Sequence, residues 1–168
     1  MKIQIRAEQS SDIEEIEKIT QVAFQQIEYS SHTEHLIVNA LRSRQQLSLS
    51  LVALDGGQIV GHVAVSPVRL SSNDANWYGL GPISVLPQYQ GKGIGQQLVH
   101  EVLRQLKNSG AHGCVLLGDP HYYQKFGFRA DSRLVLANVP AEYFQMMSFK
   151  TTVPQAEVFY DDAFYLTE

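Results

Sequence analysis

The stretch Pro87-Gln88-Tyr89-Gln90-Gly91-Lys92-Gly93-Ile94-Gly95 decides the fold of this chain. Residues 83–86 before it have the pattern of a short buried strand, and residues 96–107 after it have that of an amphipathic helix. Glycines let backbone N–H groups converge in the turn, and the first helical turn adds unpaired amides with a partial positive charge. A Cβ would block positive φ or the close approach of a diphosphate. The stretch therefore indicates a phosphate-binding turn.

Two familiar phosphate loops do not fit this turn. A P-loop needs Ser or Thr after Gly-Lys, but Lys92 is followed by Gly93. A dinucleotide-binding G-x-G-x-x-G counted from Gly91 places its third position on Gln96. A plain glycine-containing connection between a strand and a helix stays open for the loop taken alone. The remaining pattern, Gln90-x-x-Gly93-x-Gly95, resembles the acyl-CoA pyrophosphate signature of the GNAT superfamily of N-acetyltransferases.

Length and composition limit the classes of protein to consider. The 168 residues are enough for one domain with its own core, so we expect a single domain over 1–168. A net charge of −4 without a Lys/Arg cluster argues against a nucleic-acid partner. One cysteine excludes an internal disulfide. With no apolar run of membrane length and no signal-peptide pattern, we expect a cytoplasmic protein without membrane contact. A homodimer is left open.

Hydrophobic periodicity predicts the order of the elements. Alternation predicts an opening strand at residues 3–5, and helical spacing predicts helices over 13–24 and 34–44. Strand-forming runs on either side of Asp55-Gly56-Gly57 predict a hairpin. The next predicted elements are a strand over 77–86, broken near Gly81-Pro82, and a buried strand over 114–118. They are followed by a short helix over 120–125, a helical turn or loop over 142–147 and a strand over 153–160. This order predicts an α+β fold with one βαβ crossover at the glycine loop.

The resemblance to GNAT proteins covers most of the chain. It rests on Val85-x-Pro87-x-x-Gln90-x-x-Gly93-x-Gly95 and on Tyr123-Gln124-Lys125-Phe126-Gly127-Phe128, two elements in the family's order and at its distance. It implies a central, twisted, mostly antiparallel sheet with helices on both faces. The segments Leu80-Gly81-Pro82 and Leu117-Gly118-Asp119-Pro120 look like a poorly characterised bacterial branch of predicted N-acetyltransferases.

The resemblance also assigns residues to the cofactor and to catalysis. It implies that acetyl-CoA binds through Gln90, Gly91, Lys92, Gly93, Ile94 and Gly95. The backbone of Ile83, Ser84 and Val85 would pair with the pantetheine, with the Val85 N–H as an oxyanion donor, although a plain core strand stays open. Tyr123 occupies the place of the family's general acid. A phenol is protonated at neutral pH and could donate to the leaving thiolate. The neighbouring Tyr122 is more typical of a packing residue.

The general base is not defined by the sequence. Many relatives carry a glutamate on the strand before the loop, but residues 77–86 contain no acid. We consider His62 first, with His121, Glu34 and His32 as alternatives, and a water relay through the backbone and Ser84 as another. Cys114 lies in an apolar run and is interpreted as inert core. His32 and His35 are not assigned as metal ligands.

These observations predict an acetyl-CoA-dependent N-acetyltransferase that needs no metal. The acetyl group would pass to a primary amine, on a small molecule or a peptide, by direct attack in a ternary complex. The alternative is a catalytically silent acyl-CoA-binding sensor or interaction domain. We expect the loops 25–33 and 138–152 to shape the acceptor pocket. A transferase would open this pocket between loop 25–33, the strand that contains His62 and the helix that contains Tyr123.

Overall fold

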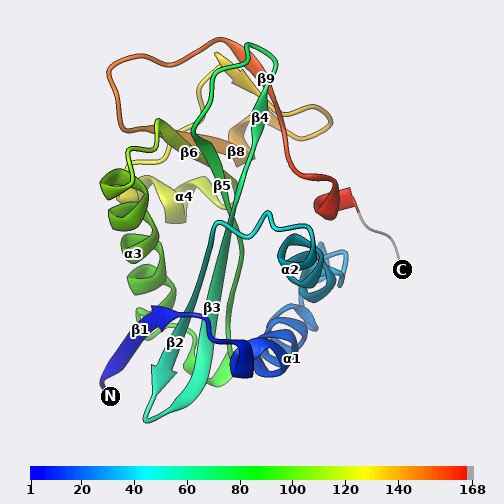
Figure 1. Ribbon diagram of the computed structural model, residues 1–168, viewed down its shortest axis with the longest axis vertical. Coiled ribbons are helices and arrows are strands. Elements are labelled where there is room, and N and C mark those ends of the chain that lie inside the picture. The colour runs from blue at the N-terminus through cyan, green and yellow to red at the C-terminus, as the bar shows by residue number, and fades with distance from the viewer. Residues whose placement is uncertain (166–168) are drawn as a thin grey trace.

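The computed structural model describes residues 1–165 and has a six-stranded central sheet with helices on both of its faces (Figure 1). The helices are α1 (Ile13–Phe24), α2 (Glu34–Ser43), α3 (Ile94–Asn108) and α4 (Pro120–Tyr123). The central strands are β1 (Ile3–Ala7), β2 (Leu49–Asp55), β3 (Gln58–Pro67), β5 (Trp77–Val85), β6 (Gly113–Leu117) and β8 (Phe144–Ser148). Their order is β1-β2-β3-β5-β6-β8, and β5–β6 is the parallel pair in an otherwise antiparallel sheet. The predicted α+β fold and its β5-α3-β6 crossover are confirmed.

The two layers of helices follow from their apolar stripes. On α3, residues four apart along one face (Ile94, Leu98, Val102 and Leu106) are all buried against the sheet. α1 buries Ile16, Ile19 and Ala23 in the same way. α1 and α2 lie on one side of the sheet and α3 on the other (Figure 1). The apolar core therefore fills both faces of β2 and β3.

The hairpin between β2 and β3 forms where its turn residues predict it. Asp55 pairs with Gln58, and the two glycines between them have φ of 56° and 88°. Positive φ at both central residues is what a two-residue hairpin turn requires, and glycine meets it at little steric cost. β3 is buried from Ile59 to Ser66 because it has a strand on either side and a helix on each face.

β5 changes partners along its length. It pairs with β6 only from Trp77 to Gly79, and from there to Val85 its ladder runs to β3 alone. The register with β3 shifts between Val63 and Val65, opposite Gly81-Pro82, which confirms the predicted break in pairing there. β5 and β6 therefore separate beyond Gly79, so that the sheet opens on the side of the glycine loop.

The C-terminal part differs from the sequence prediction. Residues 142–147 were predicted as a helical turn or loop, but only Ala141–Tyr143 form such a turn, and the chain continues as β8, paired to β6. The last predicted strand is β9 (Ala156–Phe159), which joins β4 (Arg69–Leu70) and β7 (Leu134–Val135) in a separate small sheet. Within residues 1–165, no helix has the length and apolar character needed to cross a membrane.

Candidate active site

The glycine loop joins β5 to α3 and leaves open space beside its backbone. Gly91 and Gly93 have φ of 76° and 81°, and a Cβ added at either would meet no atom within 4 Å. The left-handed backbone, not crowding, therefore requires glycine here. Gly93 is the N-cap residue of α3, and the first turn of that helix carries no acidic side chain. Its unpaired amides can receive an anion.

Two hydrogen bonds fix the loop to the sheet. The Gln90 side-chain amide donates to the Val85 carbonyl at 3.1 Å, and the Tyr89 hydroxyl donates to the Asp55 carboxylate at 3.0 Å. These bonds tie the turn after β5 to the end of β5 itself and to the β2–β3 hairpin. The loop is thus held in place by protein contacts alone, before any ligand binds.

A cavity of about 380 Å³ lies over this loop. Its lining includes Val85, Gly91, Gly93, Gly95, Tyr122 and Lys125. The Lys125 ammonium lies 4.0 Å from the centre of the Tyr122 ring, and the exposed Lys92 lies nearby on the loop. Lys125 on its wall and a helix N-terminus make this cavity suitable for a diphosphate, whereas Lys92 is not among the lining residues. Lys125 was not predicted from the sequence as a cofactor-binding residue. Its position two residues after Tyr123 was the available signal.

Residues 83–85 alternate across the opening between β5 and β6. Ile83 lines the larger cavity described next, and Val85 lines the cavity over the glycine loop. Ser84 is buried, and its hydroxyl lies 3.2 Å from that of Thr20 on α1. The Ser84 side chain therefore faces α1 on the other side of the sheet, so that only its backbone can take part in a relay of protons within the opening.

A second and larger cavity, of about 830 Å³, adjoins the first. Tyr122 lines both cavities, and Tyr123 lines the larger one. Burial is the main reason that the pKa of Tyr123 is raised to about 12, with smaller contributions from Tyr122, Tyr29 and Asp119. The phenol therefore stays protonated across the physiological range. Tyr123 therefore lies in the larger cavity, next to Tyr122, at which the two cavities meet.

The walls of the larger cavity come from six parts of the chain. They are the end of α1 with the following loop, the first turns of α2, the middle of β5, the segment from β6 to α4, and two C-terminal segments around residues 136–139 and 160–165. Loop 25–33 contributes Ile27 and Tyr29, as predicted. The predicted wall from β3 is absent among the lining residues, since β5 lies between β3 and the cavity.

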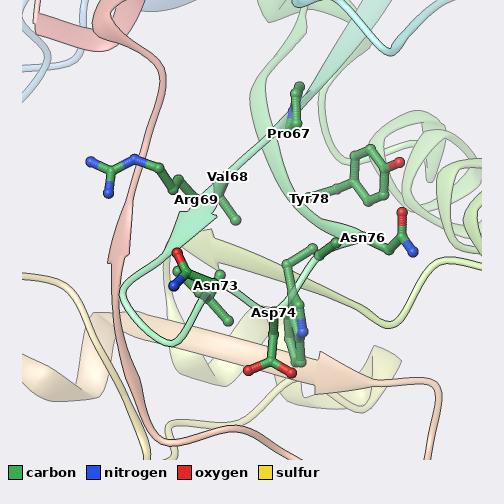
Figure 2. A pocket seen from close by; sticks show the side chains of 10 residues that line it. Pro67, Val68, Arg69, Asn73, Asp74, Asn76 and Tyr78 are labelled. Carbon is green, nitrogen blue, oxygen red and sulfur yellow. The ribbon is translucent and has the colours of Figure 1, made fainter.

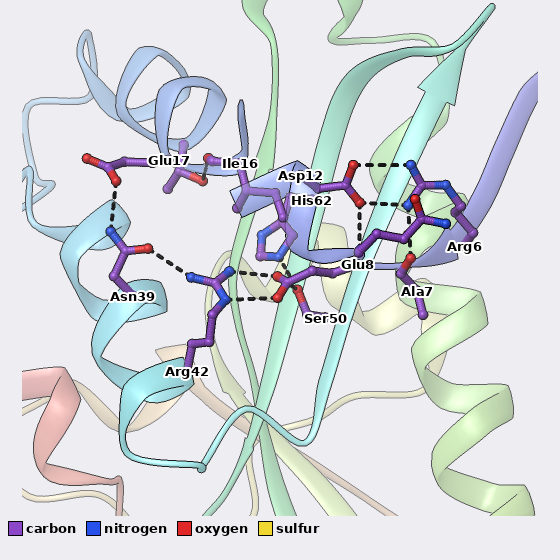
Figure 3. Close-up of polar contacts among 12 residues, drawn as sticks. Arg6, Ala7, Glu8, Asp12, Ile16, Glu17, Asn39, Arg42, Ser50 and His62 are labelled. Atoms are coloured by element: carbon purple, nitrogen blue, oxygen red, sulfur yellow. Dashed lines mark hydrogen bonds and ion pairs between the residues drawn. The ribbon is translucent and has the colours of Figure 1, made fainter. Parts of the chain in front are cut away.

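The structure does not bring His62 together with Tyr123. His62 is fully buried in β3, with its Nε2 2.8 Å from the Ser50 hydroxyl, which in turn donates to Glu8 (Figure 3). Arg42 binds the same carboxylate from α2 at 2.6 Å. Burial lowers the pKa of His62 to about 4. Because His62 lines neither cavity, it is an interior histidine and does not reach a ligand bound in either one.

Among the other candidate bases, only Glu34 lines the larger cavity. It begins α2, and the Ser30 hydroxyl lies 2.7 and 2.8 Å from its two carboxylate oxygens. His32 and His121 are exposed and line neither cavity. Asp119 is a second acid on the cavity wall and was not among the bases predicted from the sequence. An Asp-Pro pair directly after a buried strand is typical of a helix N-cap and was the available signal.

The single cysteine has no access to either cavity. Cys114 is fully buried in β6, and burial raises the pKa of its thiol to about 12. Its interpretation as core is consistent with this environment. Within residues 1–165, no group of three His, Cys, Asp or Glu residues could hold a metal ion.

A third cavity, of about 350 Å³, lies at the far end of β4 and β5 and is lined by residues around the β4–β5 turn, Asp74 and Trp77 among them (Figure 2). The Asp74 carboxylate accepts a hydrogen bond from Ser72 at 2.6 Å. None of the residues singled out from the sequence for cofactor binding or catalysis lies here. The site is therefore the pair of cavities that meets at Tyr122.

A twisted sheet that opens beside a glycine-rich helix N-terminus defines an acyl-CoA-dependent transferase fold, and comparisons with known proteins agree. Residues 4–130 match the family described as "Acetyltransferase (GNAT) domain". The chain therefore belongs to the GNAT acetyltransferase family. It is 43% identical over 101 residues to the "Uncharacterized N-acetyltransferase YhbS" of Escherichia coli, an alignment that spans 60% of each chain.

Two solved structures are similar over nearly the whole chain. A GNAT family acetyltransferase from Brucella melitensis, in complex with acetyl-CoA, is 47% identical with a TM-score of 0.87, over 97% of this chain and 98% of that one. The Escherichia coli YhbS structure, in complex with CoA, is 31% identical with a TM-score of 0.90, over 100% of this chain and 94% of that one. The predicted family membership and mostly antiparallel fold are confirmed.

Proposed function

We propose that this protein is an acetyl-CoA-dependent N-acetyltransferase that acetylates a primary amine by direct attack in a ternary complex. The observation that carries the proposal is the junction of the two cavities, with the glycine loop at one end and Tyr123 in the larger cavity at the other. The acetyl-CoA and CoA held by the two similar structures support the choice of cosubstrate.

The residues around the smaller cavity suit the cosubstrate. The N–H groups of the glycine loop and the first turn of α3 would hold the diphosphate, with Lys92 and Lys125 beside it. From there the pantetheine would run along the opening between β5 and β6. The backbone of Ile83, Ser84 and Val85 would pair with its amides, and the Val85 N–H would stabilise the oxyanion. Bound acetyl-CoA supplies a thioester carbonyl to the larger cavity.

Direct transfer is favoured over a covalent acetyl-enzyme because the single thiol of the chain is buried in the core. In the proposed step the amine nitrogen forms a bond to the acetyl carbon, the carbon–sulfur bond breaks, and an amide and free CoA result. Glu34, directly or through water, accepts the proton that the ammonium must lose before attack. Tyr123 donates to the sulfur as it leaves.

The raised pKa of Tyr123 defines how it acts. A thiol has an ordinary pKa near 8.5, so passing the proton from a phenol at about 12 costs about 5 kcal/mol. Tyr123 therefore acts as a hydrogen-bond donor to the developing thiolate and keeps its own proton, and the departing thiolate takes its proton from solvent.

The test is an initial-rate study with purified protein. Release of free thiol is followed while acetyl-CoA is varied at several fixed concentrations of an amine found active in a broad amine panel. Direct transfer predicts double-reciprocal lines that intersect. Parallel lines would indicate a covalent acetyl-enzyme and overturn the ternary complex. Tight acetyl-CoA binding without turnover of any amine would favour the silent sensor, which has no use for the open second cavity.

A further inference from the structure

Resting on this function, we propose that the acceptor is an apolar primary amine that is cationic in solution and carries no anionic group, of which an arylalkylamine is the simplest example. The inference goes beyond acetyl transfer to an unspecified amine. It is carried by the apolar walls of the larger cavity and by the sign of the charges on them.

The walls are made mainly of apolar and aromatic side chains. Phe24, Ile37, Tyr160 and Phe164 form the part toward α1, α2 and the C-terminal segment. At about 830 Å³ the cavity can hold the thioester end of acetyl-CoA and a further molecule of ring size or larger. An acceptor made of hydroxyl and charged groups would gain little binding free energy from such walls. An aromatic ring would gain more, because its apolar surface would be removed from water on binding.

The mouth of the cavity exposes further apolar surface. Tyr29, Leu117 and Tyr165 have 91%, 48% and 64% of their surface exposed, and all three line this cavity. They are three of the seven large hydrophobic side chains that are exposed in residues 1–165. Their gathering at one opening marks it as a surface that an apolar ligand covers.

The charges at the cavity have one sign. Glu34 and Asp119 contribute carboxylates, and no Lys, Arg or His of residues 1–165 belongs to the lining. An amine arrives as an ammonium ion, since its ordinary pKa is near 10.4, and two carboxylates attract it. A carboxylate on the acceptor would meet the same two acids without a cation to pair with. Amino acids and other anionic amines are therefore disfavoured.

Binding can be measured without relying on turnover. Calorimetry on the protein saturated with CoA compares three probes: phenethylamine, phenylalanine, which adds a carboxylate to the same skeleton, and ethylamine, which lacks the ring. We expect phenylalanine to bind at least 30-fold and ethylamine at least 10-fold more weakly than phenethylamine. Equal affinity for phenylalanine, equal affinity for ethylamine, or no binding of phenethylamine would each overturn the inference.

Two matched variants locate the effect. Glu34→Gln should weaken phenethylamine binding about tenfold, because it removes one of the two lining carboxylates. Glu28→Gln makes the same chemical change on the neighbouring loop, at an exposed residue outside the cavity, and should leave the affinity unchanged. Equal effects of the two variants would show a general effect of net charge and contradict the site.

Kinetics separate this inference from the proposed function. If the protein acetylates phenethylamine with a kcat/KM at least 30-fold above that for phenylalanine, both stand. Turnover of acidic or strongly hydrophilic amines in preference to phenethylamine would overturn the acceptor class and leave the transferase intact. Binding of phenethylamine in the expected order, with no acetylation of any amine, would uphold the class of ligand and remove the transferase function.

Discussion

Gly118 faces the ring of Tyr123 so closely that a Cβ on Gly118 would lie 2.9 Å from Tyr123 Cδ2 and closer still to Cε2. Gly118 follows β6, and Tyr123 ends α4 one helical turn beyond the Asp119 N-cap. The missing side chain thus makes the space in which the phenol lies against the cavity wall. The backbone of Gly118 and the ring of Tyr123 therefore fit together only when residue 118 has no side chain.

Gly118→Ala should therefore displace Tyr123 and lower kcat by about 10-fold or more, with a smaller change in the KM for acetyl-CoA. The double variant Gly118→Ala/Tyr123→Phe should be no slower than Tyr123→Phe alone, if Gly118 acts through the hydroxyl. Steady-state rates of the four proteins, with melting temperatures as a check on folding, decide this. Independent, multiplying losses would contradict the relationship.

Tyr123→Phe itself should reduce kcat by about 10²- to 10⁴-fold while acetyl-CoA affinity is retained. Because the pKa of Tyr123 is raised to about 12, its hydroxyl stays protonated, and we expect no loss of rate from its ionisation below about pH 11. Tyr122→Phe is the matched control on the same helix and should be milder. A near-normal kcat for Tyr123→Phe, with chemistry rate-limiting, rules out the role.

Gly95→Glu should abolish acetyl-CoA binding, because a carboxylate would enter the cavity that we propose for the diphosphate. Gly95 is a better position than Gly93, whose φ of 81° makes any side chain strained. Gln97→Glu adds the same charge to the first turns of α3 outside the cavity lining, so it should bind nearly normally. Calorimetry with acetyl-CoA compares the two. Retained affinity in a folded Gly95→Glu protein would contradict the assignment of the loop.

The buried His62 should make stability depend on pH. Its pKa of about 4 in the folded state lies below the ordinary value of 6.5, so the unfolded chain takes up a proton first as the pH falls. Stability should then decrease between pH 6.5 and 4, by about 3 kcal/mol in all. Burial opposes ionisation of Glu8, but hydrogen bonds from Arg42 and Ser50 outweigh it, so that the pKa of Glu8 is lowered. Protonation of Glu8 at low pH therefore decreases the stability of the folded chain further.

Urea unfolding at several pH values measures this effect. His62→Gln cannot take up the proton and should show a flatter dependence between pH 6.5 and 4.5 than the wild-type protein, whatever its stability at pH 7. If the two curves fall in parallel, the buried histidine is not the cause.

The sequence predicts those parts of the fold in which local pattern and tertiary position agree. The α3 stripe and the Asp55-Gly56-Gly57 turn are both of this kind. β8 was missed because Phe144, Gln145 and Met146 are all buried, so that no alternation separates an inner face from an outer one. Its partner β6 lies about thirty residues earlier, and nothing local indicates that pairing.

The site shows the same limit. The glycine loop and Tyr123 carry recognisable spacing, and the structure brings both to adjoining cavities. His62 was considered first as the base, but it is buried and lines neither cavity. β3 is apolar along nearly its whole length, so its sequence does not tell which residues face a cavity. Asp119 reaches the larger cavity from the N-cap of α4 and Glu34 reaches it from α2. That meeting depends on the packing of elements far apart in the chain.

The early end of the β5–β6 ladder has a thermodynamic consequence. Beyond Gly79, β5 is an edge strand inside the molecule, with hydrogen-bonding groups on one side that no neighbouring strand uses. A ligand with amide groups that lies along this edge completes the sheet and binds only the folded chain. Resistance to unfolding should then rise with the logarithm of ligand concentration above the dissociation constant. If that ligand is the proposed cosubstrate, its concentration would set how far the folded chain is protected against unfolding.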